Sequence, residues 1–235
     1  LLLEGGVSLA RAYQVTAVLT VVGTALSLLI SSMTAYVLYR RDFPWRNKLS
    51  FFFYFTTLFS GGLVPSYIMW TQTFHIRNTL VALLVPNLLM GAFNVIMMRT
   101  YFTANIPDAV IEAARIDGAN EFRILYGIVL PMALPIIATI GLLVGLAYWN
   151  DWMNGLYYLN DDRMFSIQVL LMNIQRDLDS LRQQAQSGGN VNSADLPSTS
   201  VRMALTVMGV LPIMIIYPFM QKYFVKGIAI GAVKG

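Results

Sequence analysis

The sequence contains no cysteine and a single histidine, His75. Disulfide bonds, thiolate chemistry and cysteine-ligated metals are therefore excluded, and one imidazole cannot build a metal site by itself. Charged residues are also scarce, since they make up 12% of the 235 residues, whereas a soluble domain usually carries about a quarter. Because 57% of the residues are hydrophobic, we expect most of the chain to be surrounded by lipid.

Acidic residues are missing from the middle of every long apolar segment. Five segments have the roughly 20 mostly apolar residues that cross about 30 Å of hydrocarbon; they are residues 13–39, 49–70, 79–102, 128–149 and 203–224. The sequence thus predicts an all-α fold, a polytopic membrane helix bundle forming one transmembrane domain over residues 1–235. Ion- and proton-coupled transporters usually need ionisable groups near the midplane, so we expect a partner to supply the energy for any transport.

Motifs of several enzyme classes are also absent. The sequence has no Gly-x-x-x-x-Gly-Lys-[Ser/Thr] loop for phosphates, which leaves ATP hydrolysis to another chain. It has no His-Glu-x-x-His, no Ser/His/Asp arrangement and no carboxylate pair within a span, which disfavours an intramembrane enzyme. The uncharged spans equally disfavour a channel or an ion-coupled carrier. We therefore predict that the chain is not an enzyme and binds no cofactor or metal.

The distribution of charge predicts the orientation of the chain, although a net charge of +4 is too small and scattered for nucleic-acid binding. Short cytoplasmic loops collect Lys and Arg. Such residues gather in two loops between spans and in the tail: Arg40, Arg41, Arg46, Lys48, Arg99, Arg115, Arg123, Lys222, Lys226 and Lys234. We predict that these regions and the C-terminus lie in the cytoplasm. Leu1 is then outside, and a sixth span is expected before it.

Residues 105–127, between the third and fourth spans, have the pattern of a short helix. Pro107 suits a first helical turn, Asp108 favours the positive end of a helix, and Gly118 suits the left-handed residue that closes one. A second short helix can begin near Asn120. Ala113 and Ala114 would make one face shallow enough for another backbone to approach. The same pattern also fits a surface helix lying against the membrane.

Seven residues at this place match a known signature of Glu-Ala-Ala, three residues, Gly, nine residues and Ile-x-Leu-Pro. They are Glu112, Ala113, Ala114, Gly118, Ile128, Leu130 and Pro131. On these residues the chain resembles the inner-membrane permeases of bacterial ABC importers. In that family the loop is a coupling helix that sits in a groove of the ATP-binding subunit. The resemblance therefore implies coupling to that subunit for Glu112, Ala113, Ala114, Asp117 and Gly118.

Other short sequence segments, called phrases below, resemble those of the carbohydrate branch of these permeases, and within it those of the LplC/YtcP-type subgroup. They are Ala35-Tyr36-Val37-Leu38, Ser60-Gly61-Gly62-Leu63-Val64-Pro65, Met98-Arg99-Thr100-Tyr101-Phe102, Trp149-Asn150-Asp151-Trp152 and the ending from Tyr217-Pro218-Phe219 to Lys234-Gly235. The resemblance implies a substrate that is an oligosaccharide or polysaccharide, including uronate-rich ones such as alginate. An importer permease for peptides, amino acids or ions would keep the coupling loop without these phrases, and is the alternative.

The resemblance also implies an assembly in the bacterial cytoplasmic (inner) membrane. Its other parts would be a second homologous permease, two ATP-binding subunits that hold ATP and Mg, and an extracytoplasmic solute-binding protein. The Gly-rich tail over residues 225–235 could be a frayed end. In the family the matching tail reaches between the ATP-binding subunits, which would bring Lys234 and Gly235 near their nucleotide-sensing loops.

Residues 156–200 are expected to lie outside the membrane. Apolar residues at helical spacing predict an amphipathic helix over residues 165–186, followed by Gly- and Ser-rich turns. This helix either packs on the rim of the bundle or, as the resemblance implies, belongs to a loop that meets the solute-binding protein.

A sugar pathway would combine aromatic faces with amide or hydroxyl groups, because a sugar has apolar faces and many hydroxyls. The candidates are Asn87, Asn94, Tyr148, Trp149, Asn150, Trp152 and Asn154. Asn87 and Asn94 are two helical turns apart and would share one helix face. Membrane asparagines also join helices, and tryptophans also anchor at the interface. Since no Arg or Lys lies at mid-depth, an acidic substrate would need cations from the partner permease or the binding protein.

Overall fold

The computed structural model describes residues 6–186, 203–204, 206–215 and 218, and these residues contain helices and no strand. The helices are α1 (Gly6–Tyr39), α2 (Arg46–Leu58), α3 (Leu63–Ile68), η1 (Met69–Thr73), α4 (Val81–Leu84), α5 (Ala92–Asn105), α6 (Asp108–Ile116), α7 (Glu121–Ile124), η2 (Leu125–Val129), α8 (Leu130–Met132), α9 (Leu134–Trp149), α10 (Met153–Tyr158), η3 (Asp162–Met164) and α11 (Ile167–Gln186). A further helix covers Thr206–Ile215. The predicted all-α class is confirmed.

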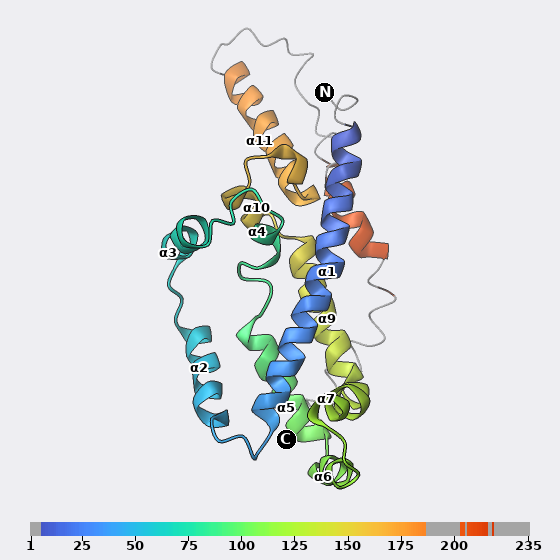
Figure 1. Cartoon of the computed structure of the whole chain (residues 1–235). Helices are drawn as coiled ribbons and strands as arrows, with labels where there is room; N and C mark the ends of the chain where they lie inside the picture. Colours follow the sequence, from blue (N-terminus) through green and yellow to red (C-terminus); the bar gives the residue numbers. More distant parts are fainter. Residues whose placement is uncertain (1–5, 187–202, 205, 216–217, 219–235) are drawn as a thin grey trace.

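Helix α1 is the long central element, and it runs beside α5 and α9 (Figure 1). Its residues Leu9–Tyr39 are long and apolar enough to cross a membrane as one helix, which agrees with the predicted span 13–39. The main core lies where these three helices meet. Its fully buried side chains include Ala35 and Leu38 of α1, Met98 and Phe102 of α5, and Ile140 of α9.

Close packing of α1 against α9 depends on one glycine. A Cβ added at Gly23 of α1 would lie 2.4 Å from the ring of Tyr148 on α9. The Tyr148 hydroxyl donates to the carbonyl of Leu84 at 2.7 Å and so joins α9 to α4. Gly23 therefore leaves the space in which Tyr148 lies flat against α1 and reaches the third span.

Two of the predicted spans are sharply bent. The span 49–70 divides into Arg46–Leu58 and Leu63–Thr73 at an angle of 113°. The span 128–149 is bent by 84° where the helix Glu121–Met132 meets Leu134–Trp149. Gly62, with a φ of 87°, marks the first break. Pro131 in α8 and Pro135 in the first turn of α9 lie on either side of the second break, at Ala133. Each bent pair is apolar enough to form one broken span.

The predicted span 79–102 is interrupted rather than continuous. Helix α4 ends at Leu84, Pro86 cannot donate a backbone hydrogen bond, Asn87 has a left-handed φ of 63°, and α5 begins at Ala92. The expectation that Asn87 and Asn94 share a helix face is therefore wrong, because Asn87 lies in a turn. Of the predicted span 203–224, the structure describes the apolar helix Thr206–Ile215; the residues after 218 lie outside the described part.

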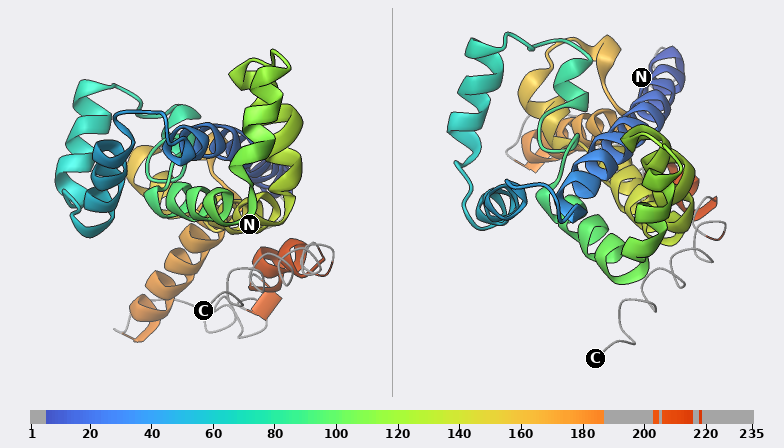
Figure 2. Two further views of the ribbon diagram at one scale, coloured as in Figure 1. Left: turned by 90° about the horizontal axis from the view of Figure 1, so that it is seen from below. Right: turned by 60° about the horizontal axis from the view of Figure 1, so that its bottom comes forward.

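The molecule has two distinct ends. Helices α6 and α7 lie at one end, beside the last turn of α1, and α10 and α11 lie at the other (Figure 1). Helices α2 and α3 stand to one side of the α1, α5 and α9 group in both further views (Figure 2). The predicted helix over 165–186 is confirmed as α11, whose Ile167 and Leu171 are buried against Ala12 of α1 and Trp149.

We predict that Gly23→Ala weakens the fold whereas Gly127→Ala does not. The added methyl group at residue 23 displaces the Tyr148 ring, and overpacking of this kind costs about 1 to 3 kcal/mol. An added Cβ at Gly127 meets no atom within 4 Å. Thermal unfolding of the purified chain in detergent should show a lower midpoint for the first variant only. Equal midpoints for wild type and Gly23→Ala would contradict the packing described above.

Candidate coupling site

Helix α6 carries Asp108 in its first turn and ends near Gly118 as its sequence predicts, but Pro107 precedes the first turn and does not lie in it. It begins after Pro107, whose backbone is extended (φ −67°, ψ 134°), and it carries Asp108 in its first turn. It closes at Gly118, whose φ is 76°. The N–H of Ala119 then donates to the carbonyl of Ala114 at 2.9 Å, which caps the end of the helix. The chain thus projects a short, well-capped helix from the end of the bundle.

The two faces of α6 differ in burial. Ile111 and Ala114 are buried against the core of this chain, whereas Glu112 and Ala113 are exposed. The expectation that both alanines form one shallow outer face is therefore wrong, because consecutive helical residues point about 100° apart. Ile116, which the sequence analysis missed, is 86% exposed. It follows Glu112 and Ala113 at helical spacing, so periodicity could have found it.

Four charged side chains tie this loop to the end of α1. Arg40 pairs with both Asp42 and Glu121, and its Nε donates to Asp42 Oδ1 at 2.7 Å. Arg115 Nη2 lies 3.5 Å from Asp42 Oδ2, and Arg115 Nε lies 3.6 Å from Glu121 Oε1. Arg40, Asp42, Arg115 and Glu121 therefore form a closed ring of alternating charge, called the ion ring below. It joins the residues after α1 to α6 and α7.

Further contacts surround the ion ring. The Tyr36 hydroxyl donates to Glu121 Oε2 at 2.7 Å, and the Tyr39 hydroxyl donates to Asp108 Oδ1 at 3.1 Å. Arg41 Nη2 lies 3.3 Å from Asp108 Oδ2. The sequence analysis assigned the arginines at 40 and 41 to orientation alone. Their pairing with Glu121 and Asp108 could not be predicted, because these partners lie about 70 to 80 residues away along the chain.

The ion ring keeps its charges under a wide range of conditions. Hydrogen bonds from Arg40 lower the pKa of Asp42 to about 2, and the charge of Arg115 acts in the same direction. Hydrogen bonding to Asp42 also raises the pKa of the Arg40 guanidinium. The Arg40 side chain is only 15% exposed. A charge this well covered depends on its partners, because a nearly buried ion without them is costly.

Three of the predicted pathway residues have partners inside the bundle. Tyr148 bonds to the carbonyl of Leu84, and Asn154 Nδ2 donates to the carbonyl of Pro86 at 3.0 Å. Both carbonyls belong to the interrupted third span. Trp149 is buried, and its Nε1 donates to the carbonyl of Gly209 at 3.1 Å. These contacts favour structural roles for the three side chains.

Asn150 and Trp152 lie instead on a hollow at the end opposite α6. The hollow measures about 370 Å³ and is lined by Asn150, Trp152, Gln168, Leu171, Met172, Gln175, Thr206, Gly209 and Val210. It combines amide groups with one half-exposed indole. Gln168 and Gln175 are two turns apart on α11. The sequence analysis missed them because only the tertiary structure places α11 next to the end of α9. Asn94 is half-buried on α5 and is not part of this lining.

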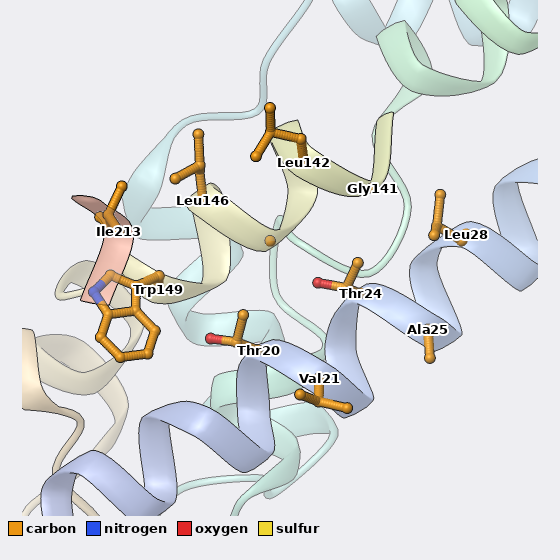
Figure 3. Close-up of a pocket in the computed structure, with 11 residues that line it drawn as sticks. Thr20, Val21, Thr24, Ala25, Leu28, Gly141, Leu142, Leu146, Trp149 and Ile213 are labelled. Atoms are coloured by element: carbon orange, nitrogen blue, oxygen red, sulfur yellow. The ribbon is translucent and has the colours of Figure 1, made fainter. Parts of the chain in front are cut away.

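A second hollow, of about 470 Å³, lies between α1 and α9 (Figure 3). Its lining is almost entirely apolar, and the hydroxyls of Thr20 and Thr24 are on the side of α1 that faces α9. Within the described residues, no group of three or more His, Asp or Glu side chains could hold a metal ion.

We predict a specific pH dependence for Asp42→Asn. The unfolded carboxyl has a pKa of about 4, so its lower folded pKa stabilises the native chain above about pH 4, and this gain is lost as the pH falls towards 2. The facing Arg40 and Arg115 stay charged throughout. The difference in unfolding midpoint between wild type and Asp42→Asn should therefore be constant from pH 7 to 5 and shrink between pH 4 and 2.

Glu112→Gln is the control for that measurement, because it removes an exposed carboxylate that makes no ion pair with the described residues. At pH 7 its unfolding midpoint should equal that of the wild type. If the Asp42→Asn difference persisted unchanged at pH 2, the carboxylate would not be held by Arg40.

Known proteins share this sequence and fold. Residues 25–230 match the family model of the binding-protein-dependent transport system inner membrane component. The chain is 40% identical over 221 residues to the polygalacturonan/rhamnogalacturonan transport system permease protein YtcP of Bacillus subtilis (strain 168), which covers 94% of this chain and 76% of that protein. It is 36% identical over 227 residues to protein LplC of the same strain, covering 96% of this chain and 74% of LplC.

A solved structure of a bacterial ABC transporter involved in the import of the acidic polysaccharide alginate is similar as well. Its TM-score to this chain is 0.79 at 30% sequence identity, covering 92% of this chain and 75% of that one. The resemblance drawn from the coupling-loop signature is thus confirmed. The chain belongs to the binding-protein-dependent transport system inner membrane components, the membrane permeases of ABC transporters, and it is not the ATPase of such a transporter.

Proposed function

We propose that this permease translocates a carbohydrate, an oligosaccharide or polysaccharide, that a solute-binding protein delivers. The relative YtcP is named for polygalacturonan and rhamnogalacturonan, and the similar solved structure is a transporter for alginate. Both names refer to carbohydrates, which supports this class of substrate over peptides and amino acids.

The coupling function rests on one observation, the exposed face of α6. Glu112, Ala113 and the 86% exposed Ile116 lie along one side of a capped helix at the end of the bundle, next to the left-handed Gly118. Docking of a partner on this face would cover Ile116, the most exposed apolar side chain of α6. We assign this face, together with Asp117, to docking in an ATP-binding subunit, and Ala114 to holding α6 on its own core.

The remaining parts of the assembly follow from this assignment. Two ATP-binding subunits, which carry ATP and Mg, would dock at the α6 end on the cytoplasmic side, and a second homologous permease would complete the pathway. The C-terminus would lie on the same side. Lys234 and Gly235, assigned to the ATP-binding interface by resemblance, lie outside the described residues.

The substrate pathway is assigned to the hollow that contains Asn150 and Trp152. An indole face and several amides suit the apolar faces and hydroxyls of a sugar ring, whereas the hollow between α1 and α9 offers little to a hydroxyl-rich ligand. Among the residues that the structure describes, those that line the Asn150 hollow include no charged side chain. A carboxylate of an acidic sugar would therefore be met by the partner permease or by the binding protein.

A pair of substitutions at Gly118 tests the docking face. Gly118→Ala and Gly118→Leu both destabilise the left-handed backbone by roughly 1 to 2 kcal/mol. Apart from the neighbouring residues in the chain, no atom of the described residues lies within 4 Å of an added Cβ. We therefore expect a docked partner to distinguish the two. We expect Gly118→Leu to lose ATP-binding subunits on purification, or to lose coupling between ATP hydrolysis and uptake, to a larger extent than Gly118→Ala.

Gly62 provides the matched control, because its φ of 87° and its open surroundings resemble those of Gly118 at a place away from α6. Gly62→Ala and Gly62→Leu should assemble and couple alike. Should Gly118→Leu and Gly118→Ala also behave alike, with normal assembly and sugar-stimulated ATPase, α6 would not be the docking helix.

Loss of the lining side chains tests the pathway. We expect Trp152→Ala and Gln175→Ala to reduce uptake of a radiolabelled oligosaccharide into proteoliposomes that hold the assembled transporter. Each substitution removes about 1 kcal/mol of interaction free energy with the sugar, which corresponds to a roughly fivefold loss of uptake. The loss should be equal for neutral and uronate oligosaccharides. Arg176→Ala, an exposed neighbour on α11 outside the lining, is the control. Unchanged uptake in both lining variants would remove the hollow from the pathway.

A further inference from the structure

The coupling loop is connected to the helices before and after it in the sequence by non-helical junctions. Between α5 and α6, Ile106 and Pro107 are extended, so no helical hydrogen bonds continue across this junction. On the other side, Asn120 is extended between α6 and α7. The helix that follows meets α9 at 84°. A displacement of α6 would therefore be transmitted weakly to α5 and α9 along the backbone, since bends and extended residues yield more readily than a continuous helix.

The same loop is fastened firmly to α1, which is distant in the sequence. The ion ring holds α6 through Arg115 and α7 through Glu121, and both acidic members contact Arg40. The Tyr39 hydroxyl adds a bond to Asp108 at the start of α6. Single exposed ion pairs contribute little, but a closed network around a side chain that is 15% exposed fixes position well.

Helix α1 is also the stiffest connection between the two ends. It has 34 residues without a break, a length of roughly 50 Å, and its sequence contains no proline. Among the described helices it is the one that can cross a membrane without a bend. At its far end, Thr16 Oγ1 accepts the backbone N–H of Ile167 at 2.8 Å, and Ala12 packs against Ile167 and Leu171 of α11.

We propose that α1 acts as a rigid helix, called the rod below, which transmits movement between the coupling loop and the extracytoplasmic helix α11. Arg40 is the positioning residue that attaches this helix to the loop. The inference rests on the proposed docking of α6. Closure of the ATP-binding subunits moves α6, the ion ring moves α1 with it, and the contact of Thr16 with Ile167 moves α11. The same path carries a signal from α11 back to the ATPase.

The first test breaks the ring in the assembled transporter of permeases, ATP-binding subunits and solute-binding protein. Arg40→Gln should leave ATP hydrolysis running while sugar uptake per ATP falls about fivefold or more. Arg46→Gln removes the same charge at the first residue of α2, outside the ring, and should couple normally. A spin label at Arg176, on the exposed face of α11, should change its spectrum with ATP and vanadate in the Arg46→Gln background and not in the Arg40→Gln background.

Two further variants keep the test decisive if Arg40→Gln fails to assemble. Tyr39→Phe removes only the bond to Asp108 and a second one to the Ile106 carbonyl, and should lower uptake per ATP about twofold. Arg40→Cys with Glu121→Cys breaks the ring, and a bifunctional thiol reagent of matching length should restore coupling. Residues 1–235 contain no cysteine, so within them the reagent acts at these two sites alone.

The outcomes separate this inference from the function on which it rests. Gly118→Leu could uncouple the transporter while Arg40→Gln, Tyr39→Phe and the spin label all behave as in the Arg46→Gln control. In that case α1 does not transmit the movement, and the docking of α6 stands. If Gly118→Leu has no effect either, the docking itself is wrong. Failure of the thiol reagent to restore coupling would also overturn the rod, because a mechanical link must work when it is covalent.

Discussion

Pairing of backbone polar groups in a medium without water is the constraint on which the rest of this structure depends. In hydrocarbon each unpaired N–H or C=O costs several kcal/mol, so the chain folds into helices. Where a helix is interrupted, other groups must take over. The third span breaks around Pro86, and the freed carbonyls of Leu84 and Pro86 accept hydrogen bonds from Tyr148 and Asn154. Polar side chains of the interior thereby make the break possible.

The same low dielectric drives charged residues to the ends of the bundle, where they can meet one another. Arg40, Asp42, Arg115 and Glu121 form the ion ring just beyond the last turn of α1. The arginines in these loops thus have two effects. By the positive-inside rule they predict a cytoplasmic position for these loops. They also lock the loop that bears the family signature onto the end of α1, about 70 to 80 residues earlier in the sequence.

A division between stiff and bent helices follows from these two effects. Helix α1 is straight enough to connect both ends, whereas the second and fourth predicted spans are bent at glycine and proline residues. Bent spans can change their angles at low cost, while a continuous helix moves as a body. In the proposed mechanism the permease is driven from one end and needs both properties, and α6, the ion ring and α1 would supply the rigid part.

The sequence by itself determined the helical class, the capped helix α6 with its left-handed Gly118 and the family, because these depend on composition, local backbone preference and a motif of fixed spacing. It did not determine the bends within the spans, the inward position of Ala114 or the pairing of Arg40 with Glu121. Hydropathy averages over about 20 residues and does not register one left-handed Asn87. Only the tertiary structure decided which distant charges and hydroxyls meet, since helix packing sets those contacts and no local preference encodes them.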